Sequence, residues 1–199
     1  MSEAPKRARR SAGEPALQVK VALRGISKPP VWRRLILPAD MTLEHLHHAI
    51  QASFGWTDMH LHVFSTGAGE YGVPDPGLGF GDERRVRLGA LLEEPGDRIQ
   101  YTYDFGDDWE HNITLEKLLI AGLDAQLPAC TAGKGACPPE DCGGAWGYAD
   151  LKAALADPGN EEHADMLEWL GLDGSEEFDP AAFDLAEANY ELALSAAGR

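Results

Sequence analysis

The fold of this chain is signalled most clearly by residues 98–119, which read RIQYTYDFGDDWEHNITLEKLL. Apolar and polar side chains alternate through residues 98–105 and again through residues 109–119, which is typical of half-buried strands. The segment Phe105-Gly106-Asp107-Asp108 between the two runs has the composition of a tight turn. The stretch therefore predicts a β-hairpin.

An earlier part of the chain predicts a second hairpin and a helix. Apolar residues alternate with polar ones from Ala16 to Arg24, residues 25–30 contain two prolines and a glycine, and residues 31–37 are rich in β-branched and aromatic side chains. Thr42 then stands at an N-cap position before apolar residues at helical spacing, which predicts an amphipathic helix that ends near Gly55.

The remaining segments complete an α+β prediction. We expect a strand at residues 61–64, a long loop at 66–82, a mixed segment at 86–92 and an aperiodic loop at 127–147. Helices are expected at about 148–156, 161–170 and 180–196, the last capped by Asp179. Strands first and helices last predict an antiparallel sheet of two hairpins plus extra strands, packed by an N-terminal helix and a C-terminal group of helices on one face.

Composition limits the classes of protein that fit. The chain has 199 residues and a net charge of −16, and residues 101–199 carry 21 acidic against four basic side chains. Residues 1–14 are basic and predict a disordered tail, followed by a single domain at residues 15–197. Acidic surface disfavours a nucleic-acid partner. Without a long apolar run or a secretory signal, we expect no membrane partner and a cytoplasmic location.

The three cysteines of the chain, Cys130, Cys137 and Cys142, fall within thirteen residues, in a segment called here the cysteine loop (residues 130–142). Thiolates bind zinc, but a structural zinc site needs four ligands. The fourth would come from elsewhere: His60, His62, His111 or Asp141. The alternatives are reduced thiols that pack in the interior and a redox or nucleophilic cysteine.

Two further segments carry candidate polar chemistry. The turn of the 98–119 hairpin gathers carboxylates and one imidazole: Asp104, Asp107, Asp108, Glu110 and His111. Such a cluster can hold a hard cation or raise the pKa of a carboxyl, and the alternative is a polar turn that caps its own backbone. On a strand, His60 and His62 would face the same side and could share one metal ion or anion. His45, His47 and His48 are expected on the solvated face of the first helix.

Binding residues are expected among the tryptophans and arginines, because both types anchor interfaces. The candidates are Trp32, Arg33, Arg34, Trp109 and Trp146, with packing in a small core as the alternative for the tryptophans. The sequence has no Walker loop, GxSxG, GxGxxG or HExxH motif, so the enzyme classes that these motifs mark lose support.

Five ordered blocks between about residues 16 and 190 resemble the plasmid pRiA4b ORF-3-like family. They are Pro29-Pro30-Val31-Trp32-Arg33-Arg34, Phe54-Gly55-Trp56 through His60-Leu61-His62, residues 103–111 (YDFGDDWEH), residues 137–144 (CPPEDCGG) with Gly147-Tyr148, and Phe178-Asp179-Pro180 with Phe183-Asp184. Asp108 stands where the family commonly has glycine, which makes this turn more acidic.

The resemblance implies a family without an assigned activity. Some of its members are described as TnpR-like passenger proteins of insertion elements, which implies a link to mobile elements. A serine resolvase would need an activated serine among arginines, and Ser53 and Ser65 lack that setting.

The sequence therefore favours a non-catalytic binding or accessory protein with a protein or small-ligand partner, and the three cysteines are its candidate zinc ligands. The alternative is a metal-dependent hydrolase of phosphoesters that uses the turn carboxylates with His60, His62 and His111.

Overall fold

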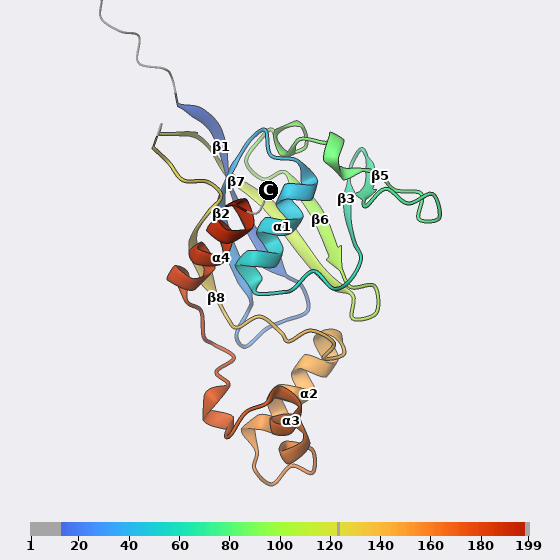
Figure 1. The fold of residues 1–199 in the computed structure, drawn as a ribbon, viewed down its shortest axis with the longest axis vertical. Helices are drawn as coiled ribbons and strands as arrows, with labels where there is room; N and C mark the ends of the chain where they lie inside the picture. The colour runs from blue at the N-terminus through green and yellow to red at the C-terminus, as the bar shows by residue number, and fades with distance from the viewer. Residues whose placement is uncertain (1–12, 123, 198–199) are drawn as a thin grey trace, which may run out of the picture.

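The computed structural model describes residues 13–122 and 124–197, and these residues form an eight-stranded sheet with four α-helices (Figure 1). The strands lie side by side in the order β5-β4-β3-β6-β7-β1-β2-β8, and all pairs except β4–β5 are antiparallel. Their bounds are β1 Glu14–Leu23, β2 Trp32–Pro38, β3 His62–Thr66, β4 Gly69–Gly72, β5 Gly81–Asp82, β6 Arg98–Tyr103, β7 Trp109–Ala121 and β8 Ala129–Lys134. The α+β prediction is confirmed.

Both predicted hairpins are present and together form the middle of the sheet. Strands β1 and β2 pair from Ala16↔Pro38 to Ala22↔Trp32, and β6 and β7 pair from Arg98↔Thr114 to Tyr103↔Trp109. The two hairpins join through the antiparallel pairing of β1 with β7.

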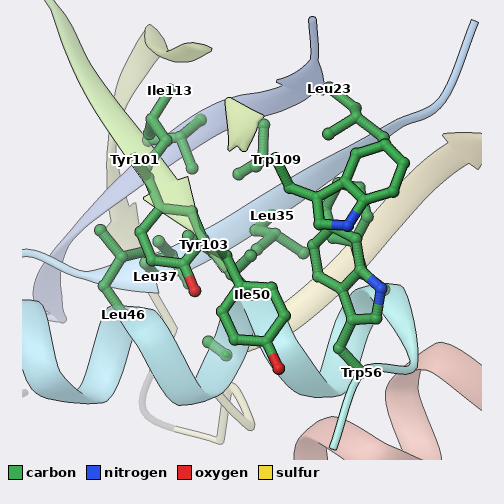
Figure 2. Packing of buried hydrophobic residues seen from close by; sticks show 14 of the residues in the cluster. Leu23, Leu35, Leu37, Leu46, Ile50, Trp56, Tyr101, Tyr103, Trp109 and Ile113 are labelled. Carbon is green, nitrogen blue, oxygen red and sulfur yellow. The ribbon is translucent and has the colours of Figure 1, made fainter. Parts of the chain in front are cut away.

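The first helix, α1 (Leu43–Phe54), covers one face of the sheet. It begins and ends as predicted: the Thr42 hydroxyl accepts a hydrogen bond from the His45 amide at 3.2 Å, and Gly55 closes the helix in a left-handed conformation. Leu46 and Ile50 point from α1 toward the inner side chains of the sheet, among them Tyr101 (Figure 2). Each such fully buried leucine or isoleucine contributes about 1.5–3 kcal/mol.

The C-terminal helices lie in two places. Helix α4 (Leu185–Ala197) packs beside α1 and against β8, whereas α2 (Gly144–Ala156) and α3 (His163–Leu170) form a small lobe at one end of the sheet (Figure 1). The opposite face of the sheet carries the alternate, half-exposed side chains of its strands, including Lys20 and Trp32.

Several predicted boundaries are wrong, for identifiable reasons. The expected loops at 66–82 and 127–147 contain β4, β5 and β8, whose small residues show no alternation because pairing with a neighbouring strand decides their conformation. Helix α2 begins at Gly144 without a side-chain cap. Helix α4 begins at Leu185, because Asp184 accepts from the amides of residues 186 and 187, while Asp179 forms a separate turn.

The predicted tail lies mostly outside the described residues, since its residues 1–12 are not described and β1 already starts at Glu14.

Candidate functional site

A cluster of imidazoles and carboxylates lies beside β3, at the exposed edge of α1. We call it the His47 group, and it comprises His47 of α1, Asp58 of the α1–β3 connection, His62 at the start of β3 and Glu83 of the short 3₁₀ turn Glu83–Arg85. His47 and His62 are buried, with side chains 1% and 4% exposed. The helix, the sheet and the following turn therefore each place a potential ligand at one point.

The two imidazoles of this group stack face to face. Their ring centroids are 3.6 Å apart and their planes differ by only 7°. His47 Nε2 lies 2.8 Å from Asp58 Oδ1, and His62 Nε2 lies 2.8 Å from Glu83 Oε2. One ligand atom each from His47, Asp58 and His62 can be chosen within 4.8 Å of one another, a spacing that a single metal ion can bridge.

The other nitrogen of His47 is held from behind by a buried polar chain. His47 Nδ1 lies 2.8 Å from the Tyr101 hydroxyl, which accepts a hydrogen bond from the Gln51 amide at 3.1 Å. The Gln51 carbonyl oxygen in turn accepts from the backbone amide of Asp58 at 3.0 Å. Two members of the group are thus oriented by the same glutamine, as the outer partners of metal ligands commonly are.

Burial and pairing set the protonation of this group. Burial lowers the pKa of His47 more than its hydrogen bond to Asp58 raises it, so the neutral, ligating form of the imidazole is favoured. The hydrogen bond from His47 lowers the pKa of Asp58. Burial raises the pKa of Tyr101 well above its ordinary value and keeps the phenol protonated.

A pocket of about 370 Å³ opens beside the His47 group. Seven of its ten lining residues carry an imidazole or a carboxylate: Glu44, His47, His48, Asp58, His60, His62 and Glu83. The His47 group therefore packs against the protein interior on one side, and on the other side a ligand in the pocket can reach it.

A second cluster lies at the same end of the sheet and is called here the His60 group. His60 Nε2 lies 3.1 Å from Asp141 Oδ1, 3.7 Å from Asp104 Oδ2 and 3.9 Å from Glu140 Oε2. Glu140 is also tied to the sheet, because its carboxylate accepts hydrogen bonds from the Tyr103 hydroxyl and the Thr57 amide. This group joins the hairpin turn to the cysteine loop.

The predicted polar residues are thus divided among different surroundings. His60 and His62 border one pocket, but their Nε2 atoms belong to different groups, because the strand begins only at His62. Asp107 accepts a hydrogen bond from the Gly143 amide, and Glu110 pairs with Arg24 on the surface. His111 is fully buried among aromatic rings and is not part of either group.

A zinc site at the three cysteines stays a prediction. Neither group of potential metal ligands found among residues 13–122 and 124–197 contains a cysteine. All three thiols are free, and burial raises their pKa values, to about 12 for Cys142. The cysteine loop is held by hydrogen bonds, including one from the Trp56 indole to the Pro138 carbonyl at 3.0 Å.

The residues predicted for binding are spread over the molecule. Trp109 is part of the core, and Arg33 is buried, where Nε and Nη1 donate to four backbone carbonyls, including those of Lys134 and Gly135. Trp32 lies on the open face of the sheet, with Arg34 stacked at 5.3 Å from its ring centroid and paired with Glu116. Trp146 is 87% exposed on α2.

Sequence reasoning missed three of the four members of the His47 group. His47 was expected on the solvated face, yet it follows Leu43 by four residues and precedes Ile50 by three, which places it on the buried face of α1. This helical spacing from Leu43 and Ile50 could have predicted that His47 is buried. Asp58 and Glu83 come from irregular segments, where no periodicity marks a buried carboxylate.

Among the described residues, no helix has the length and apolar character needed to cross a bilayer.

The model of the family described as "Plasmid pRiA4b ORF-3-like protein" matches residues 15–187. The uncharacterized protein y4hQ of Sinorhizobium fredii is 40% identical over 176 residues, which cover 87% of this chain and 88% of the relative. A crystal structure of MM3350, a protein of unknown function from Methanosarcina mazei, has a TM-score of 0.77 and 37% identity, covering 88% of this chain and 98% of its own.

Proposed function

The chain belongs to the plasmid pRiA4b ORF-3-like family, whose relatives above carry no assigned role, and we propose that it is a binding protein for a divalent metal ion. The ion is zinc or a related first-row divalent ion. His47 and His62 supply imidazole nitrogens, and Asp58 and Glu83 supply carboxylate oxygens. The ion would complete its coordination from the pocket.

The observation that carries this proposal is the parallel pair of buried imidazoles, each with its Nε2 atom against a carboxylate. A buried polar side chain usually has the hydrogen-bond partners that it needs, without further ionisable groups gathered around it. Here two imidazoles and two carboxylates from separate elements gather at one pocket wall. Imidazole and carboxylate ligands together suit zinc and its neighbours better than magnesium or calcium, which prefer oxygen ligands alone.

An ion would require small changes in distance and a tilt of one imidazole, because the in-plane lone pairs of two stacked rings run parallel. Bonds of about 2.1 Å at tetrahedral angles place two ligand atoms about 3.4 Å apart. The two nitrogen–oxygen pairs are 2.8 Å apart and would open by a few tenths of an ångström. Asp58, whose connection is exposed, can make this adjustment.

Electrostatics supports a cation at this place. The imidazole of His47 is favoured in its neutral form by burial, and the low pKa of Asp58 keeps that carboxylate charged. Glu44 adds a further carboxylate at the pocket wall. A divalent ion would therefore offset negative charge that no lysine or arginine side chain of the pocket lining neutralises.

The decisive experiment measures metal content and affinity. The protein is purified without chelator or metal-affinity tag, its metal is measured by elemental analysis, and the stripped protein is titrated with zinc against a chromophoric chelator. We expect one ion per chain, and at least about 100-fold weaker binding in His62→Gln. Cobalt bound in place of zinc should give the visible bands of a low-coordinate nitrogen–oxygen site.

Two control variants separate this site from its rivals. His45→Gln makes the same chemical change on the same helix outside the group, and it should leave affinity unchanged. Cys137→Ser should also leave it unchanged. Zinc that persists in His62→Gln and disappears in Cys137→Ser would move the site to the cysteine loop, and wild-type binding weaker than about 10 μM would overturn the proposal. Circular dichroism verifies that each variant is folded.

The proposed location and the proposed link to mobile elements rest mainly on the sequence. A cytoplasmic location fits three free cysteines, because reducing compartments keep thiols unpaired. A link to mobile elements rests on the resemblance to insertion-element passenger proteins. The phosphoester hydrolase would need the same ion, and turnover of a chromogenic phosphodiester by the metal-loaded protein is its direct test.

A further inference from the structure

A different surface, away from the His47 group, carries the most exposed tryptophan of the described residues. The Trp146 side chain is 87% exposed in the first turn of α2. Tryptophan buries a large apolar area wherever it can, so an almost fully exposed indole on a short helix lacks a packing role. Exposed aromatic side chains of this kind are frequent anchors of protein interfaces.

Trp146 borders an acidic groove of about 330 Å³. Its charged lining residues are Arg24, Asp107, Asp108 and Glu110. Arg24 is already paired with Glu110, at 2.5 Å between Nη1 and Oε2. The two aspartates add negative charge, and in the part of the chain that the structure describes neither forms an ion pair with lysine, arginine or histidine.

The groove is held in place by close backbone contacts. The Gly143 amide donates to Asp107 Oδ2 at 3.1 Å, and a Cβ atom on Gly144 would lie only 2.4 Å from the Asp107 carbonyl oxygen. A Cβ atom on Gly25 would lie 3.2 Å from that of Ala145. Gly143 and Gly144 bring the β6–β7 turn against the start of α2, and Gly25 lets the β1–β2 connection approach it, so the indole and the carboxylates keep a fixed relation.

We propose that this groove is a docking site for an arginine or lysine side chain of a basic protein segment. The cation would lie on the Trp146 ring and face the carboxylates of Asp107 and Asp108. An indole face attracts cations through its quadrupole, and neighbouring carboxylates add Coulomb attraction. The charge of residues 101–199, with 21 acidic and four basic side chains, would attract such a partner and repel nucleic acid.

The test is a nuclear magnetic resonance titration of the full chain with an octapeptide of alternating arginine and glycine. The indole N–H signal of Trp146 is identified as the one lost in Trp146→Phe. We expect this signal to move, and Trp146→Ala to weaken binding by about fivefold. Asp108→Asn should also weaken binding, and it leaves the Asp107–Gly143 hydrogen bond intact.

Two controls distinguish docking from general attraction to an acidic protein. The same peptide with citrulline in place of arginine keeps the shape but loses the charge, and it should not bind. Trp169→Ala removes another exposed tryptophan, on α3, and should leave affinity unchanged. Equal affinity in wild type, Trp146→Ala and Trp169→Ala would show non-specific attraction and overturn the proposal, as would equal binding of the citrulline peptide.

Discussion

The His47 group and the cysteine loop contain the side chains that bind metals best, yet their surroundings differ. In the His47 group, burial lowers the pKa of His47 and favours its neutral imidazole beside the charged carboxylate of Asp58, and four chain segments converge on one pocket. In the cysteine loop, burial raises the pKa of each thiol, and hydrogen bonds from neighbouring elements hold the backbone. Ligand type in the sequence is therefore a weaker guide than the protonation state that the fold imposes.

The largest expected effect concerns Arg33, which holds the start of the cysteine loop. Its guanidinium donates to the carbonyls of Trp32, Ser53, Lys134 and Gly135. Arg33→Met removes the donor of these four hydrogen bonds and should cost about 4 kcal/mol of stability in urea unfolding. Cys137→Ser should cost less than about 1 kcal/mol, since it removes no such bond. A larger loss in the cysteine variant would mean that the thiol, not the arginine, holds the loop.

The next effect is on the pH dependence of stability and concerns His111. Unlike His47 and His62, this imidazole has no carboxylate partner among the described residues. Burial lowers the pKa of His111 to about 4 from an ordinary 6.5. The unfolded chain therefore takes up a proton first as the pH falls, and stability should drop by about 3 kcal/mol between pH 6.5 and pH 4. The lowered pKa of His47 adds a loss in the same direction.

His111→Leu isolates this contribution. Urea unfolding is measured at several pH values for the variant and wild type, and the variant should show the shallower loss. Identical slopes would mean that His111 is not the neutral imidazole described here.

A smaller effect should distinguish a metal site from a fortuitous imidazole pair. Tyr101→Phe removes the hydroxyl behind His47 Nδ1 without touching the proposed ligands. Loss of such an outer partner typically costs about tenfold or more in metal affinity, so zinc binding should weaken by about tenfold in the chelator competition. Tyr148→Phe, beside the cysteine loop, is the matched control. Equal affinity in both variants would exclude a role for Tyr101 in orienting the site.

The smallest effect lies in the β6–β7 turn, which contacts the chain just after the cysteine loop. Asp108 has a φ of +56°, a left-handed conformation that costs aspartate more than glycine. Asp108→Gly should therefore raise the free energy of unfolding by about 0.5–1 kcal/mol, measured by urea unfolding. Asp108→Ala should lower it, because alanine tolerates the left-handed conformation less well than aspartate does. A stability decrease in the glycine variant would show that the Asp108 carboxylate contributes more than its backbone costs.

Sequence reasoning recovered the parts of the fold that local patterns encode. The alternation around Tyr101 and Tyr103 located a central hairpin, and Thr42 and Gly55 located both ends of α1. It failed at β8, whose conformation depends on pairing with β2, about a hundred residues away in the chain. The His47 group was missed for a related reason, since Asp58 and Glu83 acquire their role only when α1 and β3 pack together.

The pairing of β1 with β7 has a consequence for synthesis. Strand β1 aligns with residues 111–121, so the seam in the middle of the sheet joins the two halves of the chain. While a ribosome makes the residues that precede β7, the β1–β2 hairpin can form locally, but the other edge of β1 has no partner strand. At about 5–20 residues per second this interval lasts several seconds. The newborn chain then presents an unpaired strand edge, the kind of surface for which chaperones exist.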